Sequence, residues 1–223
     1  MDRRNFIKIV GFGALTAYLT GCGISAVNDN EEGVAAHDSV SGGRSLNIVL
    51  INGSPHDEKQ STSRYLAQRF AEGAEKSGHK VFMFDAANST VNPCRGCDQC
   101  GMDGACIFED DIEKFLMPKM LKSDLIILVT PLYYFGMSAQ LKIVVDRFYS
   151  RSTKLGGKKT MLMATAWNSS PWTMDALKLH YETIARYMNW KDVGQVLAIG
   201  CGSRKVPELI KFGDMAHQIG LSL

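Results

Sequence analysis

The stretch LNIVLINGSPHDEKQSTSRYL, residues 46–66, decides the fold. Residues 46–52 form a nearly continuous apolar run rich in Ile and Val, which is typical of a strand buried on both faces of a parallel sheet. The run ends at the turn residues 53–55, and apolar residues then recur at helical spacing over residues 61–77. A strand, a turn and a helix in this order predict the first unit of an α/β fold.

The rest of the body repeats this alternation. Further apolar runs predict four more strands, and helical patterns separate them; the strands are expected at residues 80–86, 124–130, 159–166 and 193–200. One of the helices is expected after the acidic residues 109–111, with Ile112, Phe115 and Leu116 on one face. Five strands alternating with helices predict an open parallel sheet covered on both sides. Ligands bind such sheets beyond the carboxyl ends of the strands, so the loops after strands one, three and four should carry the chemistry.

The first 22 residues have the layout of a signal peptide. Residues 2–8, DRRNFIK, resemble the twin-arginine export motif, and residues 19–22, LTGC, resemble a lipobox in which Cys22 becomes lipidated. An ordinary amphipathic start and a transmembrane anchor are the alternatives, but the apolar run is shorter than the roughly 20 residues that span a bilayer. The sequence thus predicts an exported lipoprotein, anchored to the membrane through its N-terminus on the extracytoplasmic side.

A polar segment without apolar periodicity, residues 23–44, is expected to be a flexible linker. Residues 45–223 are then enough for one domain with a substantial core. The net charge of +2, from 25 basic and 23 acidic residues, gives no sign of a nucleic-acid partner.

The turn after the first strand is rich in hydroxyl groups. Ser54, Ser61, Thr62 and Ser63 stand where a phosphate would meet free amide groups and the positive end of a helix. The nucleotide P-loop pattern G-x-x-x-x-G-K-[ST] is absent here, which counts against ATP or GTP. The alternative is a set of residues that caps the helix and binds no ligand.

Three stretches resemble the flavodoxin-like NAD(P)H-dependent FMN reductases and the related iron-sulfur flavoproteins. They are NGSP with STS (52–55 and 61–63), CRGCDQCGMDGACIFEDD (94–111) and TPLYYFGMSAQLKIVVDRF (130–148), and the resemblance covers residues 46 to about 220. It implies a three-layer sandwich with strand order 2-1-3-4-5 and FMN as cofactor. It places the FMN phosphate on Ser54, Ser61, Thr62 and Ser63, and the flavin ring against Thr130, Pro131, Leu132, Tyr133, Tyr134, Phe135 and Gly136.

Two points in these stretches leave alternatives. Residues 56–60, HDEKQ, are charged where members of the family often have a basic residue followed by Gly or Asn, which puts a phosphate contact by His56 in doubt. The aromatic residues 133–135 fit a flat ligand, but they could also be core residues at the end of a strand.

Four cysteines, Cys94, Cys97, Cys100 and Cys106, have the spacing C-x2-C-x2-C-x5-C. A compact run suits an iron-sulfur cluster better than zinc, whose ligand pairs are usually far apart in sequence. The resemblance implies a 4Fe-4S cluster, although some relatives with this spacing carry none. Free thiols or disulfides are the other alternative, and an oxidising compartment favours disulfides. Cys201 stands by itself and is expected to be a small buried residue.

Flavin and cluster together imply an FMN-dependent oxidoreductase that transfers electrons. The resemblance implies NAD(P)H as donor; outside the membrane, a quinol pool or a redox partner protein is the alternative. An electron carrier with no substrate of its own and a lipid-anchored binding module without cofactor are the other hypotheses. No side chain stands out as an acid or base catalyst, and the oligomeric state is left open, a homo-oligomer being one possibility.

Overall fold

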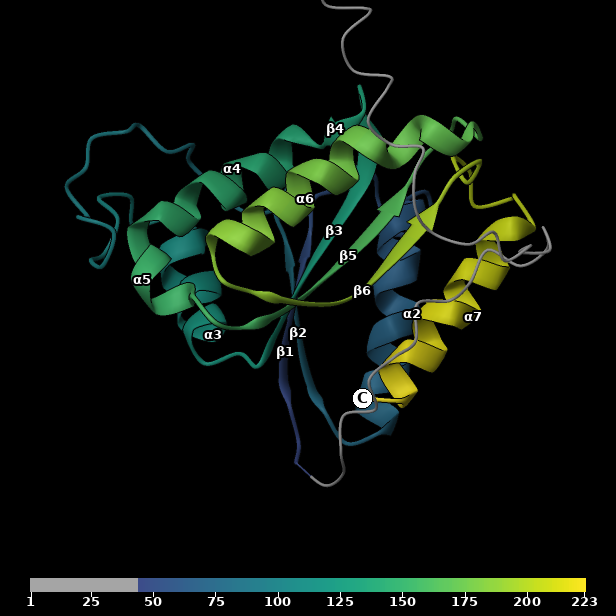
Figure 1. Cartoon of the computed structure of the whole chain (residues 1–223), viewed down its shortest axis with the longest axis horizontal. Coiled ribbons are helices and arrows are strands. Elements are labelled where there is room, and N and C mark those ends of the chain that lie inside the picture. Colours follow the sequence, from purple (N-terminus) through teal and green to yellow (C-terminus); the bar gives the residue numbers. More distant parts are fainter. Residues whose placement is uncertain (1–43) are drawn as a thin grey trace, which may run out of the picture. The chain divides into compact units, whose positions relative to one another are not determined.

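The computed structural model describes residues 44–223, which form a parallel sheet between two layers of helices (Figure 1). The predicted signal peptide with Cys22, and the predicted linker up to residue 43, lie outside the described residues. Within residues 44–223, no helix is both long and apolar enough to cross a bilayer.

The sheet has five parallel strands: β1 Asn47–Asn52, β2 Lys80–Asp85, β3 Leu125–Tyr133, β5 Lys159–Thr165 and β6 Lys191–Ala198. They lie in the order β2-β1-β3-β5-β6, and in register Ile51 pairs with Phe84 on one side and with Leu128 on the other. The two-residue strand β4, Gly136–Met137, pairs antiparallel with β3. The predicted flavodoxin-like order of the parallel strands, 2-1-3-4-5, is therefore confirmed.

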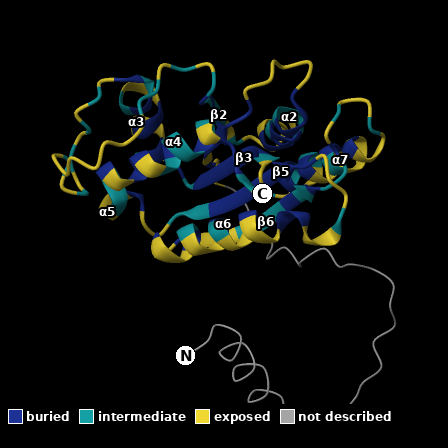
Figure 2. Ribbon diagram, turned by 90° about the horizontal axis from the view of Figure 1, so that it is seen from above, coloured by how far each residue is buried: buried dark blue, intermediate teal, exposed yellow. Residues whose placement is uncertain are grey.

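Each face of the sheet has its own core. Alternate residues of β1 point to opposite sides, so Ile48 and Leu50 belong to one core while Val49 and Ile51 belong to the other. The first core is covered by α2 Thr62–Lys76 and α7 Glu208–Leu221, and the second by α3 Met117–Leu121, α4 Ala139–Arg147, α5 Ser152–Leu155 and α6 Asp175–Tyr187. Figure 2 shows the buried strands between these layers and exposed residues on the outer face of α6.

Helices α2 and α7 approach each other closely because glycines line their contact. A Cβ atom on Gly73 would lie 2.1 Å from the carbonyl oxygen of His217, and one on Gly220 would lie 2.3 Å from that of Phe70. Any larger residue would force the backbones apart.

The helix expected after residues 109–111 differs from the prediction. It begins with a π-helical turn, Ile112–Leu116, which leads into α3. Ile112 and Leu116 are buried, but 59% of Phe115 is exposed, so its predicted place on the same face is wrong. A π-helical turn is wider than an α-helical turn, and its residues three apart in sequence no longer share a face.

Two short 3₁₀ helices connect the remaining elements. Phe148–Arg151 joins α4 to α5, and Pro171–Met174 leads into α6. Both of these segments contribute side chains to the sites described below.

Candidate flavin and cysteine sites

The predicted phosphate loop joins β1 to α2, and its four hydroxyl residues are all buried. Ser61 caps α2, because its Oγ accepts a hydrogen bond of 3.0 Å from the Arg64 amide. Thr62 Oγ1 donates to Thr165 Oγ1 at the end of β5, at 2.8 Å. Ser63 Oγ is buried without a hydrogen-bond partner in the described part of the chain.

This unpartnered hydroxyl tests whether an anion fits the loop. A buried polar group without a partner is unfavourable, and the first amides of a helix also lack partners within the helix. A phosphate at the start of α2 would accept hydrogen bonds from both and would meet the positive end of the helix dipole. The residues present therefore fit the phosphate of FMN.

The charged segment at residues 56–60 shapes its own turn. Asp57 Oδ1 accepts hydrogen bonds of 2.9 Å from the amides of Lys59 and Gln60, and the Asp57 carbonyl accepts one from Ser61. His56 is exposed, and the structure gives its side chain no role in the loop. The segment thus positions the cap of α2 through Asp57.

The predicted ring loop is the tight hairpin between β3 and β4. Tyr134 and Phe135 are the two residues of its turn, with φ of 45° and 63°, and Tyr133 pairs with Gly136. This left-handed conformation is unfavourable for residues with large side chains, but its twist suits a two-residue hairpin. Tyr133, Tyr134 and Phe135 are all exposed, so none is a core residue; Pro131 is buried, and Leu132 and Gly136 are half-buried.

The loop after β5 carries two exposed tryptophans that sequence reasoning missed, and one of them, Trp172, extends this aromatic surface. The rings of Phe135 and Trp172 lie 5.2 Å apart, while Trp167 is 81% exposed and packs against Gly202, where a Cβ atom would lie 2.4 Å from the indole ring. The sequence could have pointed to them through their position after the fourth predicted strand, in a loop where ligands are expected.

A buried hydrogen-bond network joins the phosphate loop to the ring loop. Ser138 caps α4, and its Oγ donates to the Gly53 carbonyl at 2.6 Å. The Ser138 amide donates to Thr130 Oγ1 at 2.9 Å, and the Gly53 amide donates to the Val129 carbonyl at 2.8 Å. The structure therefore brings the predicted phosphate and ring residues to one edge of the sheet.

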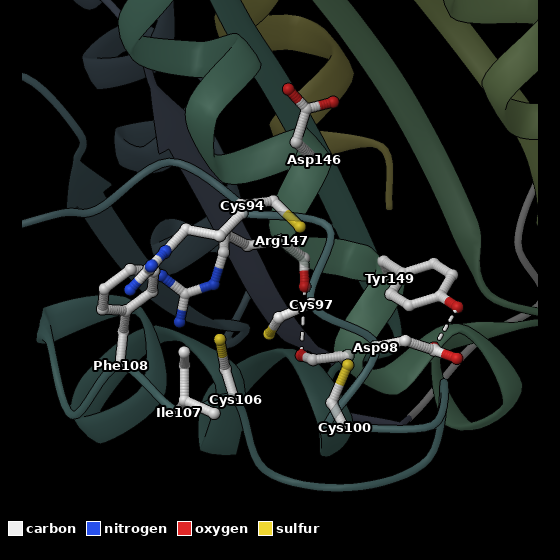
Figure 3. A pocket seen from close by; sticks show the side chains of 12 residues that line it. Cys94, Cys97, Asp98, Cys100, Cys106, Ile107, Phe108, Asp146, Arg147 and Tyr149 are labelled. Carbon is white, nitrogen blue, oxygen red and sulfur yellow. Dashed lines mark hydrogen bonds between the residues drawn. The ribbon is translucent and has the colours of Figure 1, made fainter.

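The four cysteines lie in the long loop between β2 and the π-helical turn. This loop contacts the C-terminal end of α4, whereas the phosphate and ring residues lie at the N-terminal end of that helix. All four line one pocket, together with Asp98, Phe108 and Arg147 among others (Figure 3). None of them forms a disulfide in this structure, although disulfides were one of the alternatives that the sequence left open. Cys201 is buried as predicted, and burial raises the pKa of its thiol.

The arrangement of the thiols bears on the kind of metal. Within residues 44–223, no three His, Cys, Asp or Glu side chains are close enough to hold a metal ion. Ligands of a single tetrahedral zinc lie very close together, because each Zn–S bond is only about 2.3 Å long. A four-iron cluster binds each thiolate through a different iron, so its ligands lie further apart. As they lie in this structure, the four thiols therefore do not match the ligand set of a single zinc ion.

A buried ion pair lies behind this pocket. Arg147 Nη1 donates to Asp110 Oδ2 at 2.7 Å, and the two side chains are 1% and 2% exposed. Burial opposes ionisation of Asp110, but hydrogen bonds from Arg147 and the Asn92 amide outweigh it and lower the pKa of this carboxyl.

The outer part of the cysteine loop is held by the segment after α4. Tyr149 donates to Asp98 at 2.6 Å, and this hydrogen bond, with some burial, raises the pKa of Tyr149 to about 12. Thr153 donates to Asp103 at 2.9 Å, and Lys154 forms an ion pair with the same carboxylate. These contacts are exposed and individually weak.

The edge of the sheet where the predicted phosphate and ring residues meet is called the flavin edge below. Together with the fold, it defines the class of this protein. A five-stranded parallel sheet in this order, with a hydroxyl-rich loop tied to an aromatic hairpin, is characteristic of a flavodoxin-like flavoprotein. The chain belongs to the NADPH-dependent FMN reductase family, whose model matches residues 46–203. This is a family of flavin-dependent oxidoreductases.

Curated relatives agree with this assignment. The chain is 35% identical over 111 residues to an iron-sulfur flavoprotein of Methanocaldococcus jannaschii, covering 50% of this chain and 55% of the relative. It is 34% identical over 111 residues to one of Archaeoglobus fulgidus, covering 50% and 52%. The chain spans about half the length of the curated relatives it matches.

Among solved structures, the chain resembles an NAD(P)H:quinone oxidoreductase from Methanothermobacter marburgensis, with a TM-score of 0.66 and 15% identity over 80% of this chain and 96% of the other. It also resembles an FMN-dependent NADH-azoreductase of Bacillus anthracis in complex with FMN, with a TM-score of 0.57 and 13% identity over 79% and 99%. At these identities the likeness shows the fold.

Proposed function

We propose that this protein is an FMN-dependent oxidoreductase that takes electrons from NAD(P)H, or from a membrane quinol or a redox protein, and passes them to a small-molecule or protein acceptor. The observation that carries the proposal is the buried Ser63 Oγ without a partner, at the start of a helix whose loop is tied to an aromatic hairpin. Bound FMN supplies the transfer of one or two electrons.

The residues of this chain bind and orient. Hydroxyls of Ser54, Ser61, Thr62 and Ser63, with the first amides of α2, hold the phosphate; Thr62 becomes free to donate to it when its hydrogen bond with Thr165 is reversed, with Thr165 as the donor. Hydrogen bonds to a charged acceptor contribute about 1.5 to 3 kcal/mol each, so a few of them support micromolar binding without a lysine. The hairpin residues 131–136 lie along the ring, and the exposed Trp172 widens the flat apolar surface available to a donor or acceptor.

A finer part of the proposal is a 4Fe-4S cluster on Cys94, Cys97, Cys100 and Cys106. Its support is the chemistry of the donor set: four thiols, none in a disulfide, around one pocket. The names of the curated relatives, which are iron-sulfur flavoproteins, point the same way. A cluster would pass single electrons between the flavin and a partner protein.

We also propose that the protein is exported and lipidated at Cys22. The twin-arginine route carries folded proteins, which suits a chain that binds its cofactors before export. Replacing Arg3 and Arg4 together by Lys should leave the protein in the cytoplasm, and Cys22→Ser should release it from membranes, as followed by cell fractionation and mass spectrometry. Normal export and membrane attachment of both variants would refute this part of the proposal.

The decisive experiment is anaerobic purification of the mature chain, with FMN, iron and sulfide quantified and absorption spectra recorded before and after dithionite. About one FMN per chain and a flavin spectrum that bleaches on reduction are expected. Four irons and four sulfides per chain would accompany it if the cluster is present. Failure to bind FMN, even when the chain is incubated with an excess of it, would refute the proposal.

A further inference from the structure

Arg147 is the largest fully buried side chain of the described residues, and a charged one. Its guanidinium donates from Nη1 to the Asn92 carbonyl at 2.9 Å and to Asp110 Oδ2 at 2.7 Å, and from Nη2 to Asp110 Oδ1 at 3.3 Å. It also lies over the ring of Phe108, 5.4 Å from the centroid. One rigid, planar group therefore contacts three points of the same loop.

Two of these contact points flank the four cysteines in sequence. Asn92 precedes Cys94, the first cysteine of the run, and Asp110 follows Cys106, the last. Asp110 also accepts a hydrogen bond of 2.8 Å from the Asn92 amide, so the two ends of the loop are joined both directly and through Arg147. Closing a long loop in this way removes conformational freedom that a metal would otherwise have to restrict on binding.

Stability by itself does not account for such a pair. Desolvating two charges is so costly that well-packed apolar residues of similar size are often as stabilising. The planar fork of arginine instead fixes direction as well as distance, and Arg147 itself lines the cysteine pocket. In Figure 3 the side chains of Arg147 and Phe108 lie next to each other among the residues that line the pocket.

We infer that Arg147 is the positioning residue of the cysteine site: by clamping Asn92 to Asp110, it keeps the segment that carries the fourth thiol close to the segment that carries the first three before any metal binds. The inference rests on the cysteine site of the proposed function, but it concerns the thiols themselves. Outer groups that orient metal ligands typically change metal affinity by about 10- to 100-fold when they are replaced.

The test is Arg147→Lys, which keeps the charge and loses the fork. Arg151→Lys is the matched control, because Arg151 pairs with Glu113 and contacts neither end of the loop. The first readout is ferrous iron with sulfide, added anaerobically to the reduced, metal-free chain and followed by cluster absorption and by the rate at which a chelator then removes the iron. We expect removal to be about 10- to 100-fold faster for Arg147→Lys and unchanged for the control, with FMN binding intact in both.

A second readout needs no metal. Phenylarsine oxide condenses with two neighbouring thiols, forming two As–S bonds and releasing one water, so its rate reports how closely the thiols are held. Capture should be at least tenfold slower in Arg147→Lys than in the wild type and the control. Equal rates of iron removal and equal arsenic rates for the two variants would overturn the inference. A wild type that captures arsenic rapidly but takes up no iron would refute the cluster and leave the clamp supported.

A measurement on the wild-type chain covers the case in which Arg147→Lys does not fold. Amide hydrogen exchange in the metal-free protein should be slow at Asn92, which donates to Asp110, and fast at residues 95–97 in the exposed part of the loop. Equally fast exchange at both places would show that the clamp is absent and would overturn the inference.

Discussion

Gly53→Ala tests the contact on which the flavin edge depends. Gly53 lies between β1 and the phosphate loop, directly against the first turn of α4. A Cβ atom there would lie 2.5 Å from Leu141 Cβ, 2.6 Å from Ser138 Oγ and 3.0 Å from the Leu141 amide nitrogen. These atoms belong to the start of a packed helix and cannot move aside separately, so the added methyl group must push the loop and α4 apart.

The size of the effect follows from two losses. Overpacking a tight interior typically costs about 1–3 kcal/mol. The hydrogen bond from Ser138 to the Gly53 carbonyl, which contributes about 1 kcal/mol, is lost when the loop moves. We expect the free energy of unfolding to fall by about 3 kcal/mol, roughly a 100-fold change in the folding equilibrium. FMN binding should weaken at least tenfold, because the phosphate loop leaves its place.

Urea unfolding of the apoprotein and titration with FMN, followed by flavin fluorescence, measure the two quantities. Gly156→Ala is the control: a Cβ atom there has its closest contact at an ordinary 3.4 Å from the Met188 carbonyl, far from the flavin edge. Its unfolding midpoint and FMN affinity should match those of the wild type. If Gly53→Ala also matched the wild type in both, the loop and α4 would not be in the contact described, and the link between phosphate and ring residues would be wrong.

Three further predictions concern single side chains. Ser63→Ala should weaken FMN binding about tenfold or more while changing apoprotein stability little, because its hydroxyl has no partner in the described chain. The control is Ser222→Ala, which removes a hydroxyl at the C-terminal end of α7. A destabilised apoprotein with normal FMN affinity would contradict the assignment. Tyr149 should ionise near pH 12, so the stability that its hydrogen bond contributes is complete below pH 10 and lost between pH 10 and 12. An ultraviolet titration of the phenolates, compared with that of Tyr149→Phe, measures this ionisation. Ionisation of Tyr149 at pH 10 would refute the prediction. Asp110→Asn should lower the free energy of unfolding by about 3–5 kcal/mol at neutral pH by leaving Arg147 unpaired. Since the pKa of Asp110 is lowered in the folded state, this difference from the wild type should shrink as the pH falls below 3.8 and stay constant above it, as urea unfolding across that range would show.

Much of the fold was predictable because it depends on short stretches. The buried runs of β1 and β3 and the turn after β1 carry their signals locally, and the parallel order follows from the family resemblance they support. The two aromatic residues of the hairpin turn were also predicted at the ring loop. Phe115 was misplaced because α-helical spacing was assumed where the backbone makes a π-helical turn.

The contacts that assemble the sites were not predictable in this way. Ser138 bonds to Gly53 across 85 residues, Arg147 to Asp110 across 37, and Thr62 to Thr165 across 103. Each of these partners has an ordinary local interpretation as a helix cap, a helix residue or part of a strand end. Only the packed sheet, which brings the ends of β1, β3 and β5 side by side, makes them neighbours.

Helix α4 connects the two sites. Its cap, Ser138, is bonded to the phosphate loop and to Thr130, and its last residue, Arg147, is bonded to both ends of the cysteine loop. Nine helical residues rise about 13 Å at about 1.5 Å each, and a helix packed into a dense core does not stretch. The separation of the two loops is thus set by the length of α4 and by the buried hydrogen bonds at its ends. The spacing of the serines and cysteines describes each loop separately, which is why it contains no information on the distance between them.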